Sequence, residues 1–423
     1  MRMFFMKKMQ DYKYHSGIIL RLYLCSRGFV IVEKNDNARR YIYNKCVEID
    51  NELFLLRKVN TYCEPVAKRI DYLKTLQNSP REISNQAPFL YEHEIDSLAK
   101  ANAIKNHKDA WSNFRKVPGT RIPTFKKKNY EKKYQTNAQY SNGQHGLFEG
   151  SVCFLDRDHM KLPIIGRVRV KGSRKQLNAL FKMNDVRIGT VTIRVDACGD
   201  AFISLQLASD EPFADVLPKT DRMIGIDVNI ENFYATSDGD IIDNPRYYAT
   251  SHDKLAKEQW KLSRKIERAK KDNRDIYKSK NLQKQRIKMS KVQRKIQRQR
   301  DEYQHICSKG LVESQDYIFS EDLRIKNMLK NHKLAKAISD VSWGSFLGKI
   351  EYKAERYGKT YLKVNAKNTT QTCSCCGYVL QKEERLTLSD RDWVCPNCGE
   401  MHVRDVNSAI VVLQRGMKES NLS

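Results

Sequence analysis

Four cysteines of this 423-residue chain have the spacing of a metal site: Cys373, Cys376, Cys395 and Cys398. They form two Cys-x-x-Cys pairs separated by eighteen residues, and a glycine follows each pair. Two such tight turns can place four thiolates at the corners of a tetrahedron, about 2.3 Å from one Zn²⁺ ion, which is the closed geometry of a structural site. The spacing therefore predicts a zinc ribbon, with a chance group of reduced cysteines or a thiol-exchange site as the alternative.

The other cysteines indicate a reducing compartment. Cys375 lies inside the first pair without the ligand spacing, so it is the spare thiol of the cluster. His402 lies near the second pair, and because four thiolates are already available we interpret it as a nucleic-acid or structural contact. The remaining six cysteines are scattered singly: Cys25, Cys46, Cys63, Cys153, Cys198 and Cys307. This usage is typical of an intracellular protein, and the opening residues lack the features of a secretory signal.

Three carboxylates stand in or beside apolar segments, where an unpaired charge is expensive to bury. Asp227 lies inside one apolar strand, Glu321 closes another, and Asp405 precedes a helix. If they converged, their mutual repulsion would favour divalent cations. Two Mg²⁺ ions held there could activate a water and stabilise the leaving oxygen of a phosphodiester. Taken singly, each acid is more often an ordinary strand-end or helix N-cap residue, and spacing alone does not establish convergence.

The chain is strongly basic, with 77 lysines and arginines against 50 aspartates and glutamates and a formal net charge of +27. Such an excess implies a polyanionic partner or an anionic membrane surface. The apolar stretches are too short, and too often interrupted by charges, for membrane insertion. Hydrophobic residues make up 40% of the chain, enough for a sizeable core, so it is not a disordered basic tail.

About half of this net charge lies in residues 251–300, which hold nineteen lysines and arginines against five acids. A solvated helix surface can also be basic, but so lopsided a segment would repel itself without a polyanion, and we expect nucleic-acid binding. Residues 125–134 interleave basic and aromatic side chains, which suits backbone contact combined with base stacking. The candidate contacts are Lys126, Lys127, Lys128, Lys261, Arg264, Lys265, Arg268, Arg294 and Arg298.

The first half of the chain predicts strands interrupted by helices. Residues 16–32 predict a strand–turn–strand unit around Arg27-Gly28, and residues 36–116 have the apolar spacing of helices. Prolines and a glycine at 118–123 mark a boundary, and residues 150–208 return to short strands. This order fits a small β-barrel with a helical insertion.

The second half, from Asp221, alternates strands and helices. It opens with a nearly continuous apolar run, as expected for a strand covered on both faces. The expected elements are, in order, strands at 223–229, 232–238 and 241–244, a basic helical hairpin over 251–309, a strand at 316–322, a helix over 343–357, a strand at 360–366 and a last helix from about Val406.

Together these residues resemble the RuvC-like nuclease region of the TnpB proteins of insertion sequences and of the miniature type V CRISPR effectors descended from them. The resemblance covers about 200 residues of the second half, in the family's order. Its matching stretches are IGIDVN, SDGDIIDNPRYY, the basic hairpin, FSEDLRIKNMLKN, SDVSWGSF, YKAERYGKTYLKV, TTQTCSCCG, WVCPNCG and RDVNSA. The first half is less similar: LRLYL, ARRYIYN, IPTFKKK and MKLPIIGRVRV look like the family's wedge and recognition modules.

The resemblance implies an acidic triad that holds Mg²⁺, with Asp227 on the family's first catalytic aspartate, Glu321 on its glutamate and Asp405 on its last aspartate. It also implies that the four cysteines form the family's zinc ribbon. The sequence departs from the family's pattern at two places. Asn229 stands where IDxG usually has glycine, which would alter the backbone beside the metals, and Cys25-Ser26-Arg27 replaces the usual proline–glutamine sequence after the N-terminal strand. Neither change removes a ligand.

The expected fold is multidomain, α+β and α/β. An N-terminal β-barrel (wedge) carries a helical recognition insertion, and a C-terminal RNase H-like (RuvC) domain carries the hairpin and an inserted zinc ribbon. The expected boundaries are 1–35 and 118–220 for the wedge, 36–117 for the insertion, 221–370 and 400–423 for the RuvC domain, and 371–399 for the zinc ribbon.

The expected function is an RNA-guided DNA endonuclease of the prokaryotic cytoplasm or nucleoid. Its partners would be a guide RNA and a double-stranded DNA target, its metals Mg²⁺ and structural Zn²⁺, and it would act as a monomer or as a dimer on one RNA. Base pairing would supply most of the specificity and the protein a check of a short flanking motif. The alternatives are an RNA-guided DNA-binding repressor without cleavage and a guide-independent accessory protein of transposition.

Overall fold

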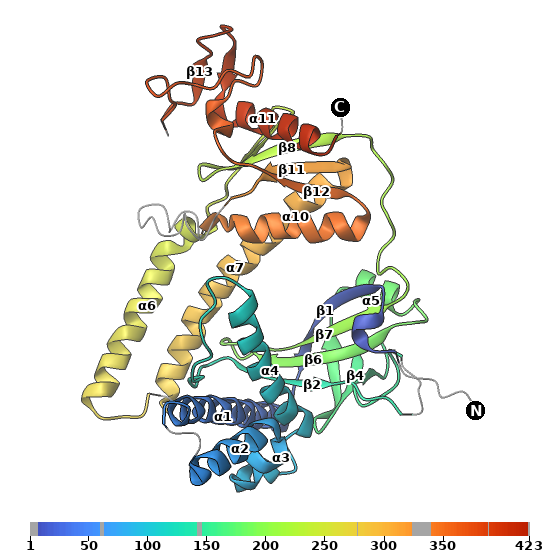
Figure 1. Ribbon diagram of the computed structural model, residues 1–423, viewed down its shortest axis with the longest axis vertical. Coiled ribbons are helices and arrows are strands. Elements are labelled where there is room, and N and C mark those ends of the chain that lie inside the picture. Colours follow the sequence, from blue (N-terminus) through green and yellow to red (C-terminus); the bar gives the residue numbers. More distant parts are fainter. Residues whose placement is uncertain are drawn as a thin grey trace. The chain divides into compact units, whose positions relative to one another are not determined.

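A computed structural model describes residues 7–59, 63–141, 146–276, 278–323, 340–387 and 389–421. The chain divides into two compact units, Met1–Phe213 and Ala214–Ser423 (Figure 1). Of the stretches that carry the family resemblance, FSEDLRIKNMLKN from position 324 onward and the first residue of SDVSWGSF, Ser339, lie outside the described residues.

The first unit is built on a curled, seven-stranded antiparallel sheet of order β2-β6-β7-β1-β5-β4-β3 (Figure 1). Its strands are β1 (Tyr14–Tyr23), β2 (Lys132–Asn137), β3 (Cys153–Phe154), β4 (His159–Leu162), β5 (Gly166–Lys171), β6 (Arg187–Val195) and β7 (Ala201–Ser209). Burial alternates along β1, where Leu20 and Leu22 are buried and Ile19 is 63% exposed, as expected when one sheet face is covered. The short helix α5 (Arg174–Leu180) adds Leu177 and Leu180 to the same core.

The strands predicted within residues 150–208, at 151–155, 166–172, 189–197 and 201–208, are present as β3, β5, β6 and β7. The sequence did not predict β2 and β4. The two edges of the sheet approach each other at Gln139, after β2, and Ser151, before β3. The Ser151 amide donates to the Gln139 carbonyl and the Gln139 amide to the Ser151 hydroxyl, both at 2.9 Å. No ladder joins β2 to β3 among the described residues, so a closed barrel stays a prediction.

A helical segment lies between β1 and β2 in the chain. It comprises α1 (Ser26–Leu56), α2 (Glu64–Asn78), α3 (Pro80–Asn85) and α4 (Ser97–Lys116), with a short 3₁₀ turn at Pro88–Tyr91 before α4. Another 3₁₀ turn, Met9–Asp11, precedes β1. The helices bury a second apolar cluster that includes Ile42, Leu73 and Ile83. A buried polar network also joins them, because the Asp50 carboxylate of α1 accepts hydrogen bonds from His107 (2.6 Å) and Trp111 (2.7 Å) of α4.

The predicted strand–turn–strand unit at 16–32 is wrong in its second half, because α1 begins at Ser26 and residues 29–32 form its first turns. The apolar, partly β-branched run at 29–32 is typical of strands. Tertiary packing overrides this preference: Ile31, Asn35 and Ala38 are all buried, at the four- and three-residue steps of one helix face.

The second unit contains a five-stranded sheet of order β10-β9-β8-β11-β12. The strands are β8 (Met223–Val228), β9 (Asn232–Thr236), β10 (Ile241–Asp243), β11 (Tyr317–Glu321) and β12 (Thr360–Val364). The pairs β8–β9 and β9–β10 are antiparallel, and β11 is parallel to both β8 and β12. Ile224 and Ile226 face α10 (Trp343–Tyr357), while the alternate residues of β8 face α11 (Arg404–Glu419), so helices cover both faces.

Two long helices form the predicted hairpin: α6 (Tyr247–Lys271) and α7 (Lys280–Ser314) (Figure 1). Leu262 and Ala269 of α6 pack on Leu282 of α7, and further along α7 Leu311 joins the core under the sheet. The described residues include no helix with the length and apolar character needed to cross a membrane.

The cysteine segment lies between β12 and α11. It opens with a 3₁₀ turn at Thr369–Gln371 and contains the small antiparallel pair β13 (Asp392–Val394) and β14 (Met401–Val403). Helix α11 follows β14 directly. Every element predicted for this half of the chain is present.

Candidate active site and zinc site

Two adjacent parallel strands bring Asp227 and Glu321 together. Ile226 of β8 lies opposite Ser320 of β11, so the next residues, Asp227 and Glu321, occupy neighbouring positions near the carboxyl ends of both strands. Side chains at matching positions of paired strands point to the same sheet face. The two carboxylates therefore share one face and one edge of the sheet.

Helix α11 lies on that face and carries Asp405 in its first turn. It approaches β8 so closely that a Cβ atom at Gly225 would lie 2.2 Å from the Ala409 carbonyl oxygen. Gly225 and Asp227 are two residues apart on one strand face, and Asp405 and Ala409 are one turn apart on one helix face. The contact that docks the helix therefore also sets Asp405 against the other two acids.

Three side chains hold the Asp405 carboxylate. The buried Arg404 guanidinium donates to Oδ1 from Nε (3.2 Å) and Nη2 (3.1 Å), and Arg391 makes an ion pair of 3.7 Å with Oδ2. Asn229 donates from Nδ2 to Oδ2 at 3.0 Å, while its own Oδ1 accepts the Asn232 amide at 2.7 Å. Both oxygens of Asp405 are thus fixed in orientation.

Burial raises the pKa of Asp227 well above its ordinary value; Glu321 and Asp405 add to this shift and Arg404 opposes it. Burial also raises the pKa of Glu321, against a hydrogen bond from the Thr369 hydroxyl. Asp227 is 6% exposed, and its carboxylate has no hydrogen-bond or ion-pair partner within the described ranges. Three neighbouring carboxylates, one of them buried and unpartnered, are unfavourable unless a cation neutralises them, and an all-oxygen donor set suits Mg²⁺.

The three acids line a cavity of about 1150 Å³. Its walls also include Arg246, His252, Trp343, Thr370 and Arg391. This space is much larger than metal ions require, so a sizeable ligand can reach the acids.

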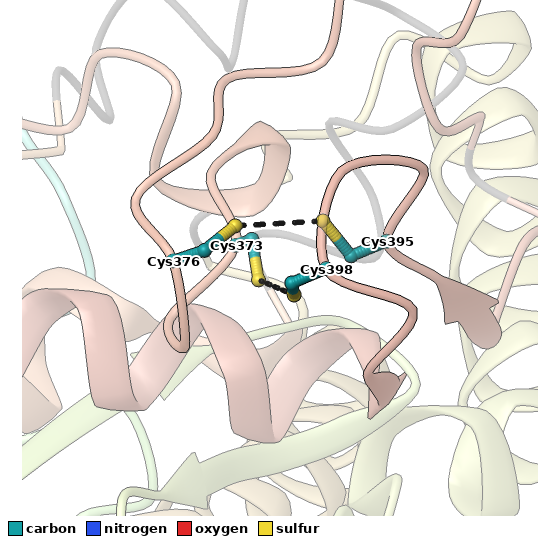
Figure 2. A group of neighbouring side chains, drawn as sticks. All are labelled: Cys373, Cys376, Cys395 and Cys398. Carbon is teal, nitrogen blue, oxygen red and sulfur yellow. Dashed lines mark hydrogen bonds between the residues drawn. The ribbon is translucent and has the colours of Figure 1, made fainter.

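The four cysteine sulfurs converge from two loops (Figure 2). Two sulfur pairs, Cys373–Cys398 and Cys376–Cys395, are each 3.7 Å apart, and all four sulfurs lie within 4.8 Å of one another. With Zn–S bonds of about 2.3 Å, the edge of a regular tetrahedron is about 3.8 Å. The residues therefore fit one structural Zn²⁺.

The two loops have the same local geometry. The Gly377 amide donates to the Cys373 carbonyl and the Gly399 amide to the Cys395 carbonyl, both at 2.9 Å. Gly377 (φ 75°) and Gly399 (φ 74°) have left-handed backbones, which glycine adopts without strain. The glycine after each Cys-x-x-Cys pair is thus what closes each turn.

His402 packs against the four-cysteine group. This position agrees with the structural contact that was one of the two interpretations from the sequence. His402 is 8% exposed, with Nε2 3.1 Å from Cys373 Sγ and its ring 4.9 Å from that of Trp393. The Asn397 side chain contacts Cys376 Sγ at 3.4 Å, and mainly through this hydrogen bond the pKa of Cys376 is lowered to about 6, which favours the thiolate that zinc binds. Cys375 is exposed and outside the four-sulfur group.

The basic segment at 125–134 is only partly available to a partner. Lys127 and Lys128 are exposed, but Lys126 Nζ lies 3.3 Å from the centre of the Tyr43 ring, and burial lowers the pKa of Lys126 to about 8. Tyr134 is 1% exposed in the core of the first unit. The exposed aromatic residues of this segment are Phe125 and Tyr130.

The other predicted contacts lie on the hairpin: Lys261, Arg264, Lys265 and Arg268 on α6, and Arg294 and Arg298 on α7. Most are exposed; Lys261 and Arg294 are half-buried. The Arg264 guanidinium lies 4.7 Å from the ring centre of Trp260, which is 59% exposed. Beside these residues the two helices form a groove of about 420 Å³. Four lysines line the groove: Lys265, Lys284, Lys288 and Lys291.

Sequence reasoning did not find the side chains that hold the acids. Arg404 carried a weak signal, since it directly precedes a carboxylate expected to be buried. Asn229 has an ordinary backbone without positive φ, so its effect on the site comes from its side chain and not from the altered backbone that was expected. Thr369 carried no signal because its partner Glu321 lies 48 positions away.

Two family models match parts of the chain. The model described as "Cas12f1-like, TNB domain" matches residues 343–412, which include α10, the cysteine segment and much of α11. The model described as "Probable transposase" matches residues 204–332, which include β8, the hairpin and β11.

Curated relatives extend over most of the chain. The "Putative RNA-guided DNA endonuclease" of Streptomyces pristinaespiralis is 29% identical over 391 residues, covering 90% of this chain and 84% of the relative. The "Putative RNA-guided DNA endonuclease InsQ" of Escherichia coli strain K12 is 26% identical over 397 residues, covering 90% and 87%.

Among solved structures, the cryo-EM structure of the Cas12f1–sgRNA–target DNA complex has a TM-score of 0.52 at 13% identity, covering 94% of this chain and 98% of that chain. The fold is therefore a mixed α/β fold of the Cas12f1 kind. The family models and curated relatives confirm the resemblance predicted from the sequence: the chain is similar to TnpB-like RNA-guided DNA endonucleases and, in part, to the Cas12f1-like TNB domain.

Proposed function

We propose that this protein is an RNA-guided DNA endonuclease. The observation that carries the proposal is the convergence of Asp227, Glu321 and Asp405 on one cavity, from two strands and a helix that lie far apart in the sequence. The names of the curated relatives and the Cas12f1-like fold agree with it.

The sheet of the second unit supports an RNase H-like (RuvC) domain, assigned to 221–370 and 400–423. Its first three strands form an antiparallel meander and the next two add in parallel, with acids on β8, β11 and α11. The cysteine segment, 371–399, is its zinc ribbon. In the first unit, we assign the curled sheet to the wedge and the helices α1 to α4 to the recognition module, which then begins at Ser26 and not at residue 36.

Asp227, Glu321 and Asp405 would hold two Mg²⁺ ions. The chemistry that such ions supply is activation of a water and stabilisation of the leaving oxygen of a phosphodiester. The unpartnered Asp227 has its carboxylate available for ligation, while Arg404 and Asn229 keep the Asp405 oxygens in one orientation. The surrounding cavity would admit one strand of DNA at a time, so that two strands are cut in turn.

The basic hairpin would bind the nucleic-acid backbone. The four-lysine groove suits phosphate groups, and the exposed Trp260 with Arg264 suits a stacked base. In the first unit, Lys127 and Lys128 are positioned to contact the guide RNA or the flanking duplex. Binding by these lysines depends on counterion release, so it would weaken steeply as salt rises.

The test is to express the protein with its native flanking DNA, sequence the RNA that copurifies, and assay Mg²⁺-dependent cleavage of a plasmid library with a matching target and randomised flanks. We expect a discrete RNA and cuts beside one flanking motif. Asp227→Ala should bind RNA and DNA normally but not cut. The mass of the protein–RNA complex distinguishes a monomer from a dimer on one RNA.

A discrete RNA with target binding but no cutting by the unaltered protein would contradict the nuclease and support the repressor. A preparation with no discrete RNA would contradict the guided mechanism and support the transposition accessory.

A further inference from the structure

The segment between β12 and the first zinc-binding turn contacts the acidic site directly. The Thr369 hydroxyl donates a hydrogen bond to Glu321 Oε1. Thr369 is 2% exposed and lies four residues before the zinc ligand Cys373. This hydrogen bond restricts the rotation of the half-buried Glu321 carboxylate, so Thr369 favours one orientation of Glu321. The same hydroxyl also lies 3.3 Å from the Ala366 carbonyl oxygen.

The same segment is attached to the helix that carries Asp405. Asn407, two residues further along α11, is 1% exposed. Its Nδ2 donates to the Thr372 carbonyl (2.8 Å) and its Oδ1 accepts the Ser374 amide (2.9 Å). These two backbone groups flank Cys373, so one amide side chain holds the zinc-binding turn from both sides.

The geometry of α11 explains how one helix serves both sites. Residues two positions apart point in nearly opposite directions from a helix, and residues seven apart share a face. Asp405 therefore points to the sheet, while Asn407 and Gln414 point to the zinc-binding turn, where Gln414 Nε2 donates to the Ser374 carbonyl at 2.8 Å. The first turn of α11 is held between the sheet on one side and the turn at Cys373 on the other.

We propose that the Thr369–Ser374 segment is a positioning element of the acidic site, with Thr369 and Asn407 as its positioning residues. Zinc bound at Cys373 would hold this segment in place, Thr369 would thereby restrict Glu321, and Asn407 would restrict the start of α11 and Asp405. Zinc binding and divalent-cation binding by the acids are therefore coupled, and coupling between two binding equilibria is reciprocal. This inference rests on the proposed metal-binding role of the acids.

The test measures Mn²⁺ binding to the full-length protein with its copurified RNA by electron paramagnetic resonance, so no cleavage is needed. Thr369→Val and Asn407→Ala should each raise the Mn²⁺ dissociation constant about 10-fold, the lower end of the effect of outer contacts on metal sites. Both should retain one zinc per chain by elemental analysis. Thr369→Ser, which keeps the hydroxyl, should restore the Mn²⁺ affinity.

Thr372→Val is the matched control. It removes a hydroxyl from the same segment, but that hydroxyl donates to the Asn368 carbonyl at 2.6 Å and to none of the acids. Its Mn²⁺ affinity should match that of the unaltered protein.

In cleavage assays the Thr369 and Asn407 variants should need more Mg²⁺ for half-maximal rate, with a smaller loss of cleavage rate at saturating Mg²⁺.

Zinc removal tests the coupling without any substitution. Chelation should weaken Mn²⁺ binding, and saturating Mn²⁺ should slow zinc loss to a chelator. Unchanged Mn²⁺ affinity in Thr369→Val, Asn407→Ala and the zinc-depleted protein would overturn this inference while leaving the proposed function intact. If the unaltered protein bound no Mn²⁺, the inference and the proposed metal site would both be wrong.

Discussion

The Asp227 carboxylate is buried, interacts electrostatically with Glu321 and Asp405, and has no hydrogen-bond or ion-pair partner among the described residues. An enzyme keeps such an arrangement when the charge is used, because a buried carboxylate without compensation is unfavourable. The charge of Asp227 should therefore lower the stability of the metal-free fold and make the free energy of unfolding depend on pH.

Asp227→Asn should reduce cleavage about a thousandfold or more, because the change removes a proposed metal ligand. The same change removes one of three repelling charges, so in the absence of Mg²⁺ the melting temperature of the second unit should rise. The stabilisation that Mg²⁺ gives the unaltered protein should disappear. Differential scanning fluorimetry with and without Mg²⁺ measures both effects, and a lower melting temperature in the metal-free variant would contradict the crowded-charge account.

The raised pKa values of Asp227 and Glu321 predict opposite pH dependences with and without metal. The folded chain binds protons at these carboxyls more tightly than the unfolded chain does. Without metal, the free energy of unfolding should therefore fall as pH rises from about 4 through the raised values. Mg²⁺ needs the ionised carboxylates, so its stabilising effect should grow over the same range. A Mg²⁺-induced rise in melting temperature that stays constant from about pH 5 to about pH 8 would contradict this predicted growth.

At the residue scale, the sequence identified the three acids and the four cysteines because their types and contexts are unusual. It could not show that the acids converge, since that depends on the register of β8 against β11 and on the docking of α11. The role of Asn229 was also invisible, because a hydrogen bond to Asp405 across 176 positions leaves no local pattern.

At the scale of elements, α11 is positioned by glycines where it meets the sheet. A Cβ atom at Gly225 would lie 2.2 Å from the Ala409 carbonyl oxygen, and one at Gly416 would lie 2.1 Å from the Phe319 ring. Both are real steric conflicts, because Cβ atoms do not approach other heavy atoms so closely. The helix can therefore lie directly on β8 and β11 only while these two positions lack side chains.

Gly225→Ala should push α11 away from β8, lower the free energy of unfolding by about 1–3 kcal/mol, and weaken Mg²⁺ binding because Asp405 moves with the helix. Gly348→Ala on α10 is the control, since a Cβ there meets nothing within 4 Å and alanine favours a helix by up to about 1 kcal/mol. Urea unfolding of both variants gives the comparison. Equal effects at the two positions would contradict the close docking of α11.

Sequence patterns predicted the elements of the second half well because its strands are short, apolar and bounded by turns, and its hairpin has long helical periodicity. They failed at residues 29–32, where a short apolar run is ambiguous between strand and helix and only packing decides. They also missed β2, whose residues Lys132–Asn137 are mostly polar and form an edge of the sheet.

At the scale of the whole molecule, each unit has cores of its own. The first buries one cluster in its curled sheet and another among its helices. The second has its own clusters on the two faces of its sheet and a small one around Cys373, Trp393 and Cys395. Separate cores are the basis for separate cooperative unfolding.

Calorimetry should therefore resolve two unfolding transitions, and zinc chelation should lower the temperature of only one, because all four cysteines of the proposed zinc site lie in the second unit. Limited proteolysis of the chelated protein should assign that transition to the second unit by leaving a fragment of the first. A single transition that chelation shifts as a whole would show that the two units unfold together.

The order of the acids along the chain has a consequence for biosynthesis. Asp405 lies on a helix that follows every strand of the five-stranded sheet. On the ribosome, the sheet can form while its third carboxylate has not yet been translated. A polypeptide that ends between Glu321 and Asp405 would carry two of the acids, with the close-packing surface around Gly225 uncovered for chaperones or proteases to recognise. Any product that ends before Asp405 therefore lacks one of the three acids of the proposed nuclease site.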